Sequence, residues 1–400
     1  MGRIIILTGK GGVGKSSVAA AHALRSAQEG KRTLLVSTDM AHNLGDIFRC
    51  QVGGKETKLG EQLFALELDP EEILRRAFPE AARALTKLFL GSSVAEAEGE
   101  LFMLPGFENL FSLLSIARLY REGRYERIIV DCAPTGETLS LLKLPELLSW
   151  YMEKFFPVGK TMVRVMSPIS KLRYKVELPN RDAMDEIGRL HQELVALQAL
   201  LKDGEICTVR LVCTPEKMVV EESKRSYMYL NLYRYQVDGV FINRVLPPAE
   251  DNAFLGTWHE IQQRYLEELH RVFAGLPIRE IPWYPEDLRG EEAIARMAED
   301  LLAGEEDFFS VRCQVENEEY EKIDGGWRLR LRLPGAGEED LSVACYDLDL
   351  DVAVGNQLRR IPLPDVLRGA RMGKAEIVNG VLCVDFWMAD GEGREGATEA

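Results

Sequence analysis

The stretch GKGGVGKS, from Gly9 to Ser16, constrains this chain more than any other, because it requires a strand, a loop and a helix in that order. It follows the apolar run RIIILT and precedes an alanine-rich segment with helical spacing. It matches every fixed position of the pattern G-x-x-x-x-G-K-[ST]. Its glycines let the backbone curl around a phosphate with the N–H groups turned inward. The stretch therefore predicts a phosphate-binding loop and, with it, nucleotide binding.

The two lysines of this loop have different expected places. Lys15 is the lysine that the pattern requires, to reach the β- and γ-phosphates, and Ser16 would offer its hydroxyl to Mg²⁺ at a helix N-terminus. Lys10 is a second lysine, where a plain phosphate loop needs none. The residues of this stretch that we expect to bind nucleotide are Gly9, Gly11, Gly12, Val13, Gly14, Lys15, Ser16 and Ser17.

Composition limits the class of protein. A formal net charge of −15 over 400 residues argues against a general nucleic-acid surface, because phosphate neutralisation needs clustered Lys and Arg. The start of the chain lacks the pattern of a signal peptide, and no apolar run reaches the roughly 18 residues of a membrane span. Seven scattered cysteines favour free buried thiols. We expect a cytoplasmic protein with at most transient membrane contact.

Six short apolar runs predict an open, mostly parallel α/β sheet. Their apolar character is continuous rather than alternating, as strands buried on both faces require, and helical patterns lie between them. The runs begin at Arg3, Thr33, Arg127, Thr208, Val237 and Ile278. The expected fold over residues 1–305 is that of a phosphate-loop NTPase, with helical insertions at about 70–124 and 144–203.

From about residue 310 the pattern changes to the period of two that is typical of strands. In WRLRLRLPG the apolar side chains alternate with arginines, which indicates a strand with one face in water. Asn379-Gly380, between two apolar runs, predicts a two-residue hairpin turn. We expect a small all-β domain over 310–390, followed by a flexible polar tail at 391–400.

Polar residues end several of the predicted parallel strands, where ligands of such sheets gather. Asp131 is placed like a Walker B carboxylate and would hold Mg²⁺ with Ser16, directly or through water. Asp39 could polarise the water that attacks the γ-phosphate. Helix capping by Asp131 and ribose recognition by Asp39 are the alternatives. Asn243 and Pro282 end two further strands.

Several separated motifs resemble those of the arsenical-pump and tail-anchored-protein targeting ATPases, a branch of the deviant phosphate-loop NTPases. The motifs are GKGGVGKS, STDMAHNLGDIF, DCAPTGETL, PEKMVVEESKRSYMYLNLY and VDGVFINRVLP, and the resemblance covers about residues 1–300. It implies that the chain is an ATPase that uses ATP and Mg²⁺. It also implies a homodimer, because in that family the lysine matching Lys10 reaches across the interface to the partner's nucleotide.

The resemblance also implies roles for single residues. Asp39 corresponds to the water-activating aspartate of switch I, and Asp131 to the aspartate of switch II. Asn243 matches the asparagine that reads the adenine edge, and the segment IPWYPEDLRG, with Pro282, resembles the loop that closes over the base. Met40 departs from the family, since a proline usually follows the switch I aspartate. The expected catalytic residues are Asp39, Lys10 and Lys15.

The C-terminal segment resembles an α-crystallin or small heat-shock domain through LRLPGAGEEDLSV and IVNGVLCVDF. Bacterial, cyanobacterial and plastid variants of the ATPase family carry such a domain as an α-crystallin-like β sandwich, and this chain resembles them over its full length.

Three functions are compatible with these features. The favoured one is an ATP-driven switch that opens and closes a site for a hydrophobic client, such as a tail-anchor helix or another apolar ligand, in targeting or chaperone-like work. The second is a positioning ATPase that dimerises on DNA or membranes, which the net acidity disfavours. The third is a chaperone-like binding module with a vestigial ATPase. An arsenite-pump motor is disfavoured, because LPGFENLF lacks the cysteine that a metalloid ligand there would need.

Overall fold

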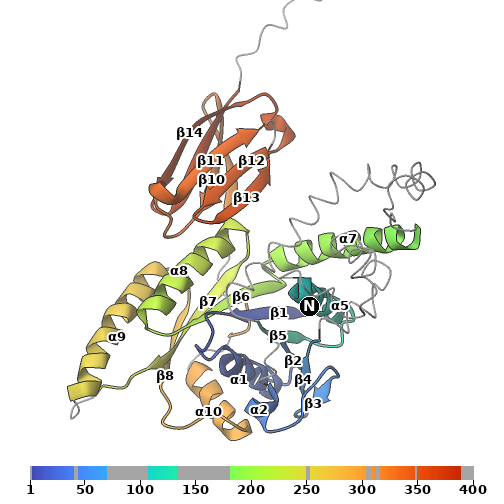
Figure 1. Cartoon of the computed structure of the whole chain (residues 1–400), viewed down its shortest axis with the longest axis vertical. Helices are drawn as coiled ribbons and strands as arrows, with labels where there is room; N and C mark the ends of the chain where they lie inside the picture. Colours follow the sequence, from blue (N-terminus) through green and yellow to red (C-terminus); the bar gives the residue numbers. More distant parts are fainter. Residues whose placement is uncertain are drawn as a thin grey trace, which may run out of the picture.

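The computed structural model describes most of the chain and leaves nine stretches out, the first of which is Met1 alone. The described residues are 2–39, 44–69, 107–132, 181–248, 253–302, 308–311, 316–346 and 349–388. Met40, the predicted tail, and much of both predicted insertions lie outside these residues. Within them the chain forms one large sheet flanked by helices and, C-terminal to it, two smaller antiparallel sheets (Figure 1). The predicted domain limits themselves stay predictions.

The large sheet confirms all six predicted strands and adds two. Its order is β3-β4-β2-β5-β1-β6-β7-β8, and every neighbouring pair is parallel except β3 with β4. The strands are β1 (Arg3–Thr8), β2 (Thr33–Ser37), β3 (Thr57–Lys58), β4 (Leu63–Glu67), β5 (Arg127–Asp131), β6 (Cys207–Cys213), β7 (Val237–Val245) and β8 (Ile278–Pro282). The two that we did not predict, β3 and β4, lie at one edge of the sheet.

Helices cover both faces of this sheet. In Figure 1, α1, α2 and α10 lie on one side of it and α5, α7 and α8 on the other. The helices are α1 (Lys15–Gln28), α2 (Leu44–Phe48), α5 (Phe107–Arg121), α7 (Arg181–Lys202), α8 (Lys217–Leu232), α9 (Ala253–Val272) and α10 (Glu291–Leu302). Helix α5 belongs to the first predicted insertion and α7 to the second. No helix in the described part of the chain is long and apolar enough to cross a membrane.

The start of α8 differs from the prediction by two residues. The order Thr-Pro-Glu predicts that Thr214 caps the helix and that Pro215 is its first residue. Instead the extended Glu216 precedes the helix, which begins at Lys217. The physical reason is a local turn, in which the Glu216 N–H donates to the Thr214 carbonyl and the Thr214 hydroxyl donates to the Glu216 carboxylate.

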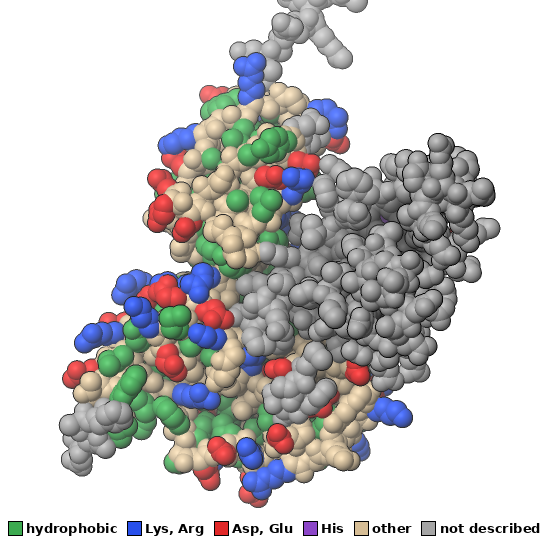
Figure 2. Space-filling model, viewed as in Figure 1, with side chains coloured by type: hydrophobic (Ala, Val, Ile, Leu, Met, Phe, Trp, Pro, Cys, Tyr) green, Lys and Arg blue, Asp and Glu red, His purple; other side chains and the backbone are tan. Residues whose placement is uncertain are grey.

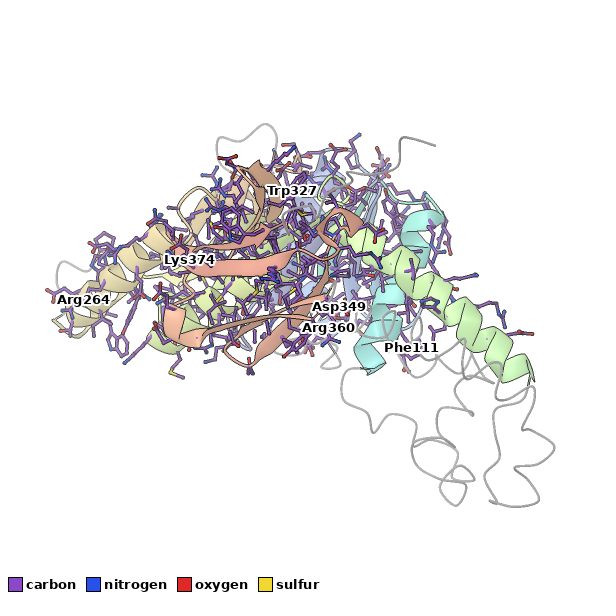
Figure 3. The ribbon with its side chains drawn as sticks, turned by 90° about the horizontal axis from the view of Figure 1, so that it is seen from above. Phe111, Arg264, Trp327, Asp349, Arg360 and Lys374 are labelled. Carbon is purple, nitrogen blue, oxygen red and sulfur yellow. The ribbon has the colours of Figure 1, made fainter. Side chains whose placement is uncertain are left out.

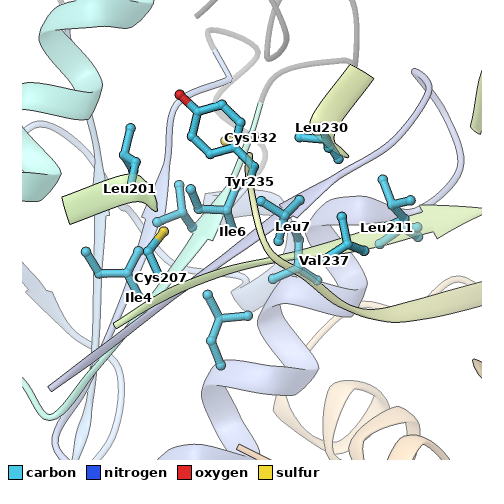
Figure 4. Close-up of a cluster of buried hydrophobic side chains, with 14 of the residues drawn as sticks. Ile4, Ile6, Leu7, Cys132, Leu201, Cys207, Leu211, Leu230, Tyr235 and Val237 are labelled. Atoms are coloured by element: carbon cyan, nitrogen blue, oxygen red, sulfur yellow. The ribbon is translucent and has the colours of Figure 1, made fainter. Parts of the chain in front are cut away.

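The core of this part lies between the sheet and the helices. Strand β1 is buried at every residue after Arg3, and β6 is buried throughout. Figure 4 shows side chains of both strands packed with Leu201 of α7 and Leu230 of α8. All described cysteines are free. Cys132, Cys207 and Cys213 are buried as predicted, whereas Cys345 and Cys383 are only half-buried and Cys50 is exposed.

A buried ion pair between β6 and β7 holds the segment that follows α10. Arg210 of β6 is fully buried, and its Nε lies 3.1 Å from Oδ1 of Asp238. Its Nη2 donates to the carbonyl oxygen of Phe308 at 2.7 Å, and Arg3 donates to the carbonyl of Phe309. The ring of His22 packs on Phe308 with centroids 4.8 Å apart. The chain is therefore anchored on the sheet before the C-terminal strands begin.

The C-terminal strands form two antiparallel sheets, which we call the β domain (residues 316–388). The first sheet has the order β14-β15-β10-β9 and the second β11-β12-β13. The strands are β9 (Glu318–Ile323), β10 (Gly326–Arg332), β11 (Leu341–Tyr346), β12 (Asp349–Val354), β13 (Gln357–Pro362), β14 (Arg371–Val378) and β15 (Val381–Trp387), with short 3-10 turns at Glu338–Asp340 and Asp365–Leu367. In Figure 3, Lys374 lies on the first sheet, and Asp349 and Arg360 lie on the second.

The predicted patterns of the β domain are confirmed. Leu329 and Leu331 of one sheet and Leu350 and Val352 of the other are fully buried, as in a sandwich core. Asn379 and Gly380 form the two-residue turn between β14 and β15, and both have positive φ, 52° and 73°. Positive φ at both central residues is what a type I′ turn needs, and Asn-Gly supplies it at low cost. Figure 2 shows acidic and basic side chains interspersed over the coloured part of the visible face.

Candidate nucleotide site

A cavity of about 680 Å³ opens at the carboxyl ends of the parallel strands. The phosphate loop, the end of β2, helix α2, the end of β7 and the segment after β8 contribute to it. Its lining residues are Gly11, Gly12, Gly14, Lys15, Ser16, Ser17, Asp39, Asp46, Ile47, Asn243, Arg244, Pro282, Trp283, Tyr284, Glu286, Asp287, Leu288 and Arg289. Nine of the predicted site residues thus meet in one cavity. Gly9, Lys10, Val13 and Asp131 are not among those that line it.

The glycines of the loop are required by close backbone packing. A side chain at Gly9 would collide with the carbonyl oxygen of Val212 in β6. Gly14 has φ of 93° and stands directly before α1, where a Cβ would collide with the amide of Asn243. Val13 is 2% exposed, so its side chain belongs to the core while its carbonyl holds the loop. The loop can curl this closely against β6 and β7 because glycine, which has no Cβ, stands at both positions.

Lys15 and Lys10 lie in different surroundings. Lys15 is 6% exposed and lines the cavity, and its Nζ donates to the carbonyl oxygen of Lys10 at 3.2 Å. The side chain of Lys10 is one-third exposed, and its Nζ lies 3.6 Å from Oε2 of Glu222 on α8. The two cations of one loop are therefore separated, with one inside the cavity and the other against a helix.

Asp131 is the buried carboxylate of the site. In register it lies between Leu7 of β1 and Ser37 of β2, so it ends the central strand next to the loop. Both carboxylate oxygens are buried without a partner of ordinary hydrogen-bond geometry among the described residues. Burial raises the pKa of Asp131 to about 6; Ser16 and Lys15 oppose this shift and Asp39 adds to it. Buried carboxylate oxygens beside a serine hydroxyl fit the oxygen shell of a Mg²⁺ ion.

Asp39 lies on the wall of the cavity, two residues beyond β2. It is partly buried, and its N–H donates to the hydroxyl of Ser37 at 3.2 Å. Its charge contributes to the raised pKa of Asp131, so the two carboxylates interact. The fold therefore brings together the two aspartates that the sequence placed at separate strand ends.

Asn243 clamps the phosphate loop from β7. Its Nδ2 donates to the carbonyl oxygen of Val13 at 2.8 Å, and its Oδ1 accepts from the Arg244 N–H at 2.9 Å. Asn243 is 5% exposed and still reaches the cavity. In this structure its amide therefore holds the loop, and Pro282 lies across the cavity at the end of β8.

The sequence did not single out several residues of the cavity. Arg244 has a positive φ of 62°, which a side chain other than glycine adopts mainly where the surroundings impose it. Glu67, at the end of β4, accepts the Leu44 N–H at 3.1 Å and so fixes the start of α2, which brings Asp46 and Ile47 to the cavity. Neither feature has a local sequence signal, since each depends on pairing with distant parts of the chain.

The segment from Pro282 to Gly290 is held from both sides. The Tyr284 hydroxyl donates to Asp300 of α10 at 2.5 Å, and Glu286 pairs with Arg296 at 2.7 Å. The Gly290 N–H donates to the carbonyl of Ile47 at 2.7 Å. Trp283 directly precedes these anchors in the chain and is 54% exposed at the cavity. The loop thus presents an aromatic surface opposite the phosphate loop.

Comparisons with known proteins agree with this architecture. The family described as anion-transporting ATPase matches residues 2–303, and the family described as an HSP20-like domain found in ArsA matches residues 324–386. The first match covers the α/β part, and the second covers most of the β domain.

Three relatives illustrate the similarity. A putative arsenical pump-driving ATPase of Chlorobaculum tepidum is 37% identical over 388 residues, which is 96% of each chain. Putative arsenical pump-driving ATPase 1 of Aquifex aeolicus is 32% identical over 386 residues, 94% of this chain and 97% of that protein. The ATPase get3 of Pyrenophora tritici-repentis is 30% identical over 315 residues, 75% of this chain and 91% of that protein.

The phosphate loop, the cavity at the strand ends and these matches lead to one conclusion. The chain belongs to the anion-transporting ATPase family, carries the HSP20-like domain found with it, and is an ATP-hydrolysing enzyme.

Proposed function

We propose that this ATPase is a homodimeric switch, whose nucleotide state opens and closes a site for a hydrophobic client in protein targeting or chaperone-like work. The observation that carries the proposal is the position of Lys10. It belongs to the phosphate loop but does not line the cavity of its own subunit, and it is one-third exposed beside Glu222. A cation placed in this way suits a nucleotide bound by a partner subunit. The similarity to ATPases named GET3 supports the targeting role.

In this proposal different residues of the site bind the phosphates, the metal ion, the attacking water and the base of ATP. The loop N–H groups and Lys15 bind the phosphates, because they combine a positive helix terminus with a buried cation. Ser16 and Asp131 would hold Mg²⁺, and the ion would neutralise phosphate charge. Asp39 orients and polarises the attacking water. Asn243 and Pro282 lie where the base would bind. The cytoplasm is the proposed compartment.

The two lysines give the first test. Lys15→Ala removes the cation inside the cavity, so we expect loss of both ATP binding and hydrolysis. Lys10→Ala leaves the cavity lining intact, so it keeps the affinity for a non-hydrolysable ATP analogue and loses turnover by about 10³-fold, as a cation supplied in trans would. Lys31→Ala, which breaks an exposed pair with Glu126, is the matched control with parental turnover.

Assembly is measured on the same proteins by analytical ultracentrifugation. The parent should sediment as a dimer with the ATP analogue, and Lys10→Ala should remain largely monomeric. The proposal is wrong if Lys10→Ala hydrolyses ATP as fast as the parent, or if the parent stays monomeric with the analogue bound.

Client binding is tested with a variant that is expected to stay in the ATP-bound dimer. Asp39→Asn should bind ATP and hydrolyse it slowly, and it should therefore retain a client that the parent releases. A synthetic tail-anchor helix and a polar helix of equal length are the probes. Retention of the apolar helix by Asp39→Asn with ATP supports the proposal; equal retention of both helices contradicts it.

An arsenical-pump motor is a second candidate, because relatives at 37% and 38% identity carry pump-driving names. Among the described residues no group of three His, Cys, Asp or Glu side chains is placed to hold a metal ion. The segment LPGFENLF lies partly outside those residues. The test is turnover with and without arsenite or antimonite: stimulation favours the pump motor, and an unchanged rate favours the client switch.

A further inference from the structure

Helix α8 contacts both the phosphate loop and the β domain. Figure 1 shows it beneath the β domain, along the face of the large sheet. Glu222, Tyr229 and Tyr233 follow one another at spacings of seven and four, which places them on one side of the helix. At 1.5 Å per residue, Glu222 and Tyr233 are roughly 16 Å apart along the axis. One rigid helix therefore spans the distance between two sites.

The first half of α8 lies against the phosphate loop. The carboxylate of Glu222 is 3.6 Å from Nζ of Lys10. The helix follows β6 after three residues, and in β6 the Val212 carbonyl lies against Gly9. A change in the position of Lys10 or of the loop therefore acts directly on this half of the helix.

The second half of α8 is bonded to the β12–β13 hairpin. The Tyr229 hydroxyl donates to Oδ1 of Asn356 at 3.1 Å, and the Tyr233 hydroxyl donates to the carbonyl of Leu358 at 3.0 Å. Gly355, with φ of 58°, fits so closely that a Cβ there would lie 3.2 Å from the Tyr229 hydroxyl. Two hydrogen bonds and one close approach of the backbone therefore hold α8 against the hairpin.

Arg359 caps the end of α8 from the β domain. Its Nη1 donates to the carbonyl oxygen of Leu232, the last residue of the helix, at 2.8 Å. It is 4% exposed and pairs with Glu318 of β9 at 2.7 Å. A buried cation at a helix C-terminus is favourable because it meets unsatisfied carbonyls and the negative end of the dipole. The β domain thus supplies the hydrogen-bond donor that the C-terminal end of α8 lacks within the helix.

We propose that α8 couples the nucleotide site to the β domain, so that ATP binding changes the contact with the β12–β13 hairpin and the hairpin in turn sets the affinity for ATP. The coupling rests on the proposed function, in which Lys10 turns from Glu222 toward a nucleotide. A packed helix responds to such a change by a small rigid shift rather than by bending. The shift reaches Tyr229, Tyr233 and the Arg359 cap, which hold the other end of the same helix.

Reciprocity makes the coupling measurable from either end. If ATP changes the hairpin contact, then weakening the contact must change the affinity for ATP by the same factor. The test uses the full chain, with a non-hydrolysable ATP analogue and Mg²⁺. The affinity is measured by calorimetry, and amide hydrogen exchange is followed over residues 355–362 with and without the analogue.

Two changes weaken the contact by different means. Arg359→Gln removes the cap, and the double change Tyr229→Phe with Tyr233→Phe removes two hydroxyl hydrogen bonds and keeps the rings. Arg360→Gln is the matched control, because Arg360 is the next residue and pairs with Asp351 inside the β domain. Circular dichroism and thermal unfolding verify that each variant folds, and the tyrosine pair gives the test if Arg359→Gln does not fold.

We expect the analogue to change exchange over 355–362 by about fivefold in the parent and in Arg360→Gln. The dissociation constant of the analogue should shift about fivefold in Arg359→Gln and in the tyrosine pair, and stay at the parental value in Arg360→Gln. The coupling is overturned if the parent binds the analogue while both the exchange and the affinities stay unchanged. If the parent does not bind the analogue at all, the proposed function fails and the coupling fails with it.

Discussion

The nucleotide site and the β domain place their aspartates in different surroundings. In the nucleotide site, Asp131 is buried, no cation among the described residues lies within hydrogen-bond distance of it, and burial raises its pKa to about 6. In the β domain, Asp385 lies directly opposite Arg328 across β15 and β10, with oxygen–nitrogen distances of 2.6 and 3.0 Å. That pairing lowers the pKa of Asp385. Asp351 and Arg360 form the same kind of cross-strand pair.

The difference indicates that the nucleotide site is arranged to bind a ligand, whereas the charge pairs of the β domain stabilise its fold. A cross-strand pair satisfies its own charges and contributes a little stability. A buried carboxylate without a partner costs stability, and it persists where a ligand that binds there restores the balance. We therefore expect changes in the α/β site to affect activity strongly and changes in the β-domain pairs to affect it little.

Among the carboxylates that line the cavity, Asp39 should have the largest effect on turnover when it is changed to Asn. The amide keeps the shape of the side chain but cannot accept a proton from water, so kcat should fall by about 10²- to 10⁴-fold. The affinity for the ATP analogue should stay near the parental value. Asp46→Asn is the matched control, because Asp46 also lines the cavity. Equal losses in the two variants, measured by phosphate release, would show that the wall as a whole and not Asp39 carries the chemistry.

Arg210→Ala should have the largest effect on stability. It leaves Asp238 buried with Arg3 as a more distant partner at 3.5 Å, and it frees the Phe308 carbonyl from its donor. Breaking a buried pair in this way costs about 3–5 kcal/mol of unfolding free energy. Urea unfolding followed by circular dichroism measures it. Replacing both partners, with Arg210→Met and Asp238→Leu, should recover much of the loss, and a double variant as unstable as Arg210→Ala would contradict this account.

Asp131→Asn should stabilise the nucleotide-free protein and abolish its ATPase activity. The pKa of Asp131 is about 6 in the fold against an ordinary 3.8. Between these values the folded state keeps a proton that the unfolded state has lost, so the carboxylate costs stability as the pH rises. The full cost, on the order of 3 kcal/mol, applies above about pH 6. The asparagine removes the cost, because it carries no charge.

Unfolding of Asp131→Asn and the parent at several pH values measures this difference. The two stabilities should agree below about pH 4 and separate toward pH 7, with the variant above the parent. Added Mg²⁺ and ATP analogue should stabilise only the parent. A variant that is less stable than the parent at pH 7 would mean that the carboxylate has partners that satisfy it.

The sequence predicts the parts of this molecule whose signals are local. Continuous apolar runs predict six of the eight strands of the large sheet, and Asn379-Gly380 predicts its hairpin because both residues tolerate positive φ. The glycines of the phosphate loop predict the curl of the backbone. In each case the residues that carry the signal are the residues that form the structure.

The parts that the sequence does not predict depend on distant pairing. The Asn243 amide reaches Val13 across 230 residues, and Arg359 caps a helix that ends 127 residues before it. Position in the chain indicates that Lys10 and Lys15 share one loop, but only the fold shows that one lines the cavity and the other lies beside Glu222. The two lysines are five residues apart in the chain, and the different surroundings that the fold gives them determine their different roles.

The smallest expected effect is that of Asp385→Asn, and its dependence on pH has the opposite sign to that of Asp131→Asn. Because Arg328 lowers the pKa of Asp385, the pair stabilises the fold above the ordinary pKa of 3.8 and loses this contribution as the pH falls through the folded pKa. The variant should unfold at a slightly lower temperature than the parent at pH 7, and the gap should close in acid. Fluorescence of Trp327, on the same strand as Arg328, would follow this domain if the other tryptophans are replaced by phenylalanine. Asp365→Asn, at an exposed pair with Arg368, is the control and should leave the transition unchanged. A gap that widens in acid would remove the contrast between the two regions, since Asp385 would then behave as a strained carboxylate like Asp131.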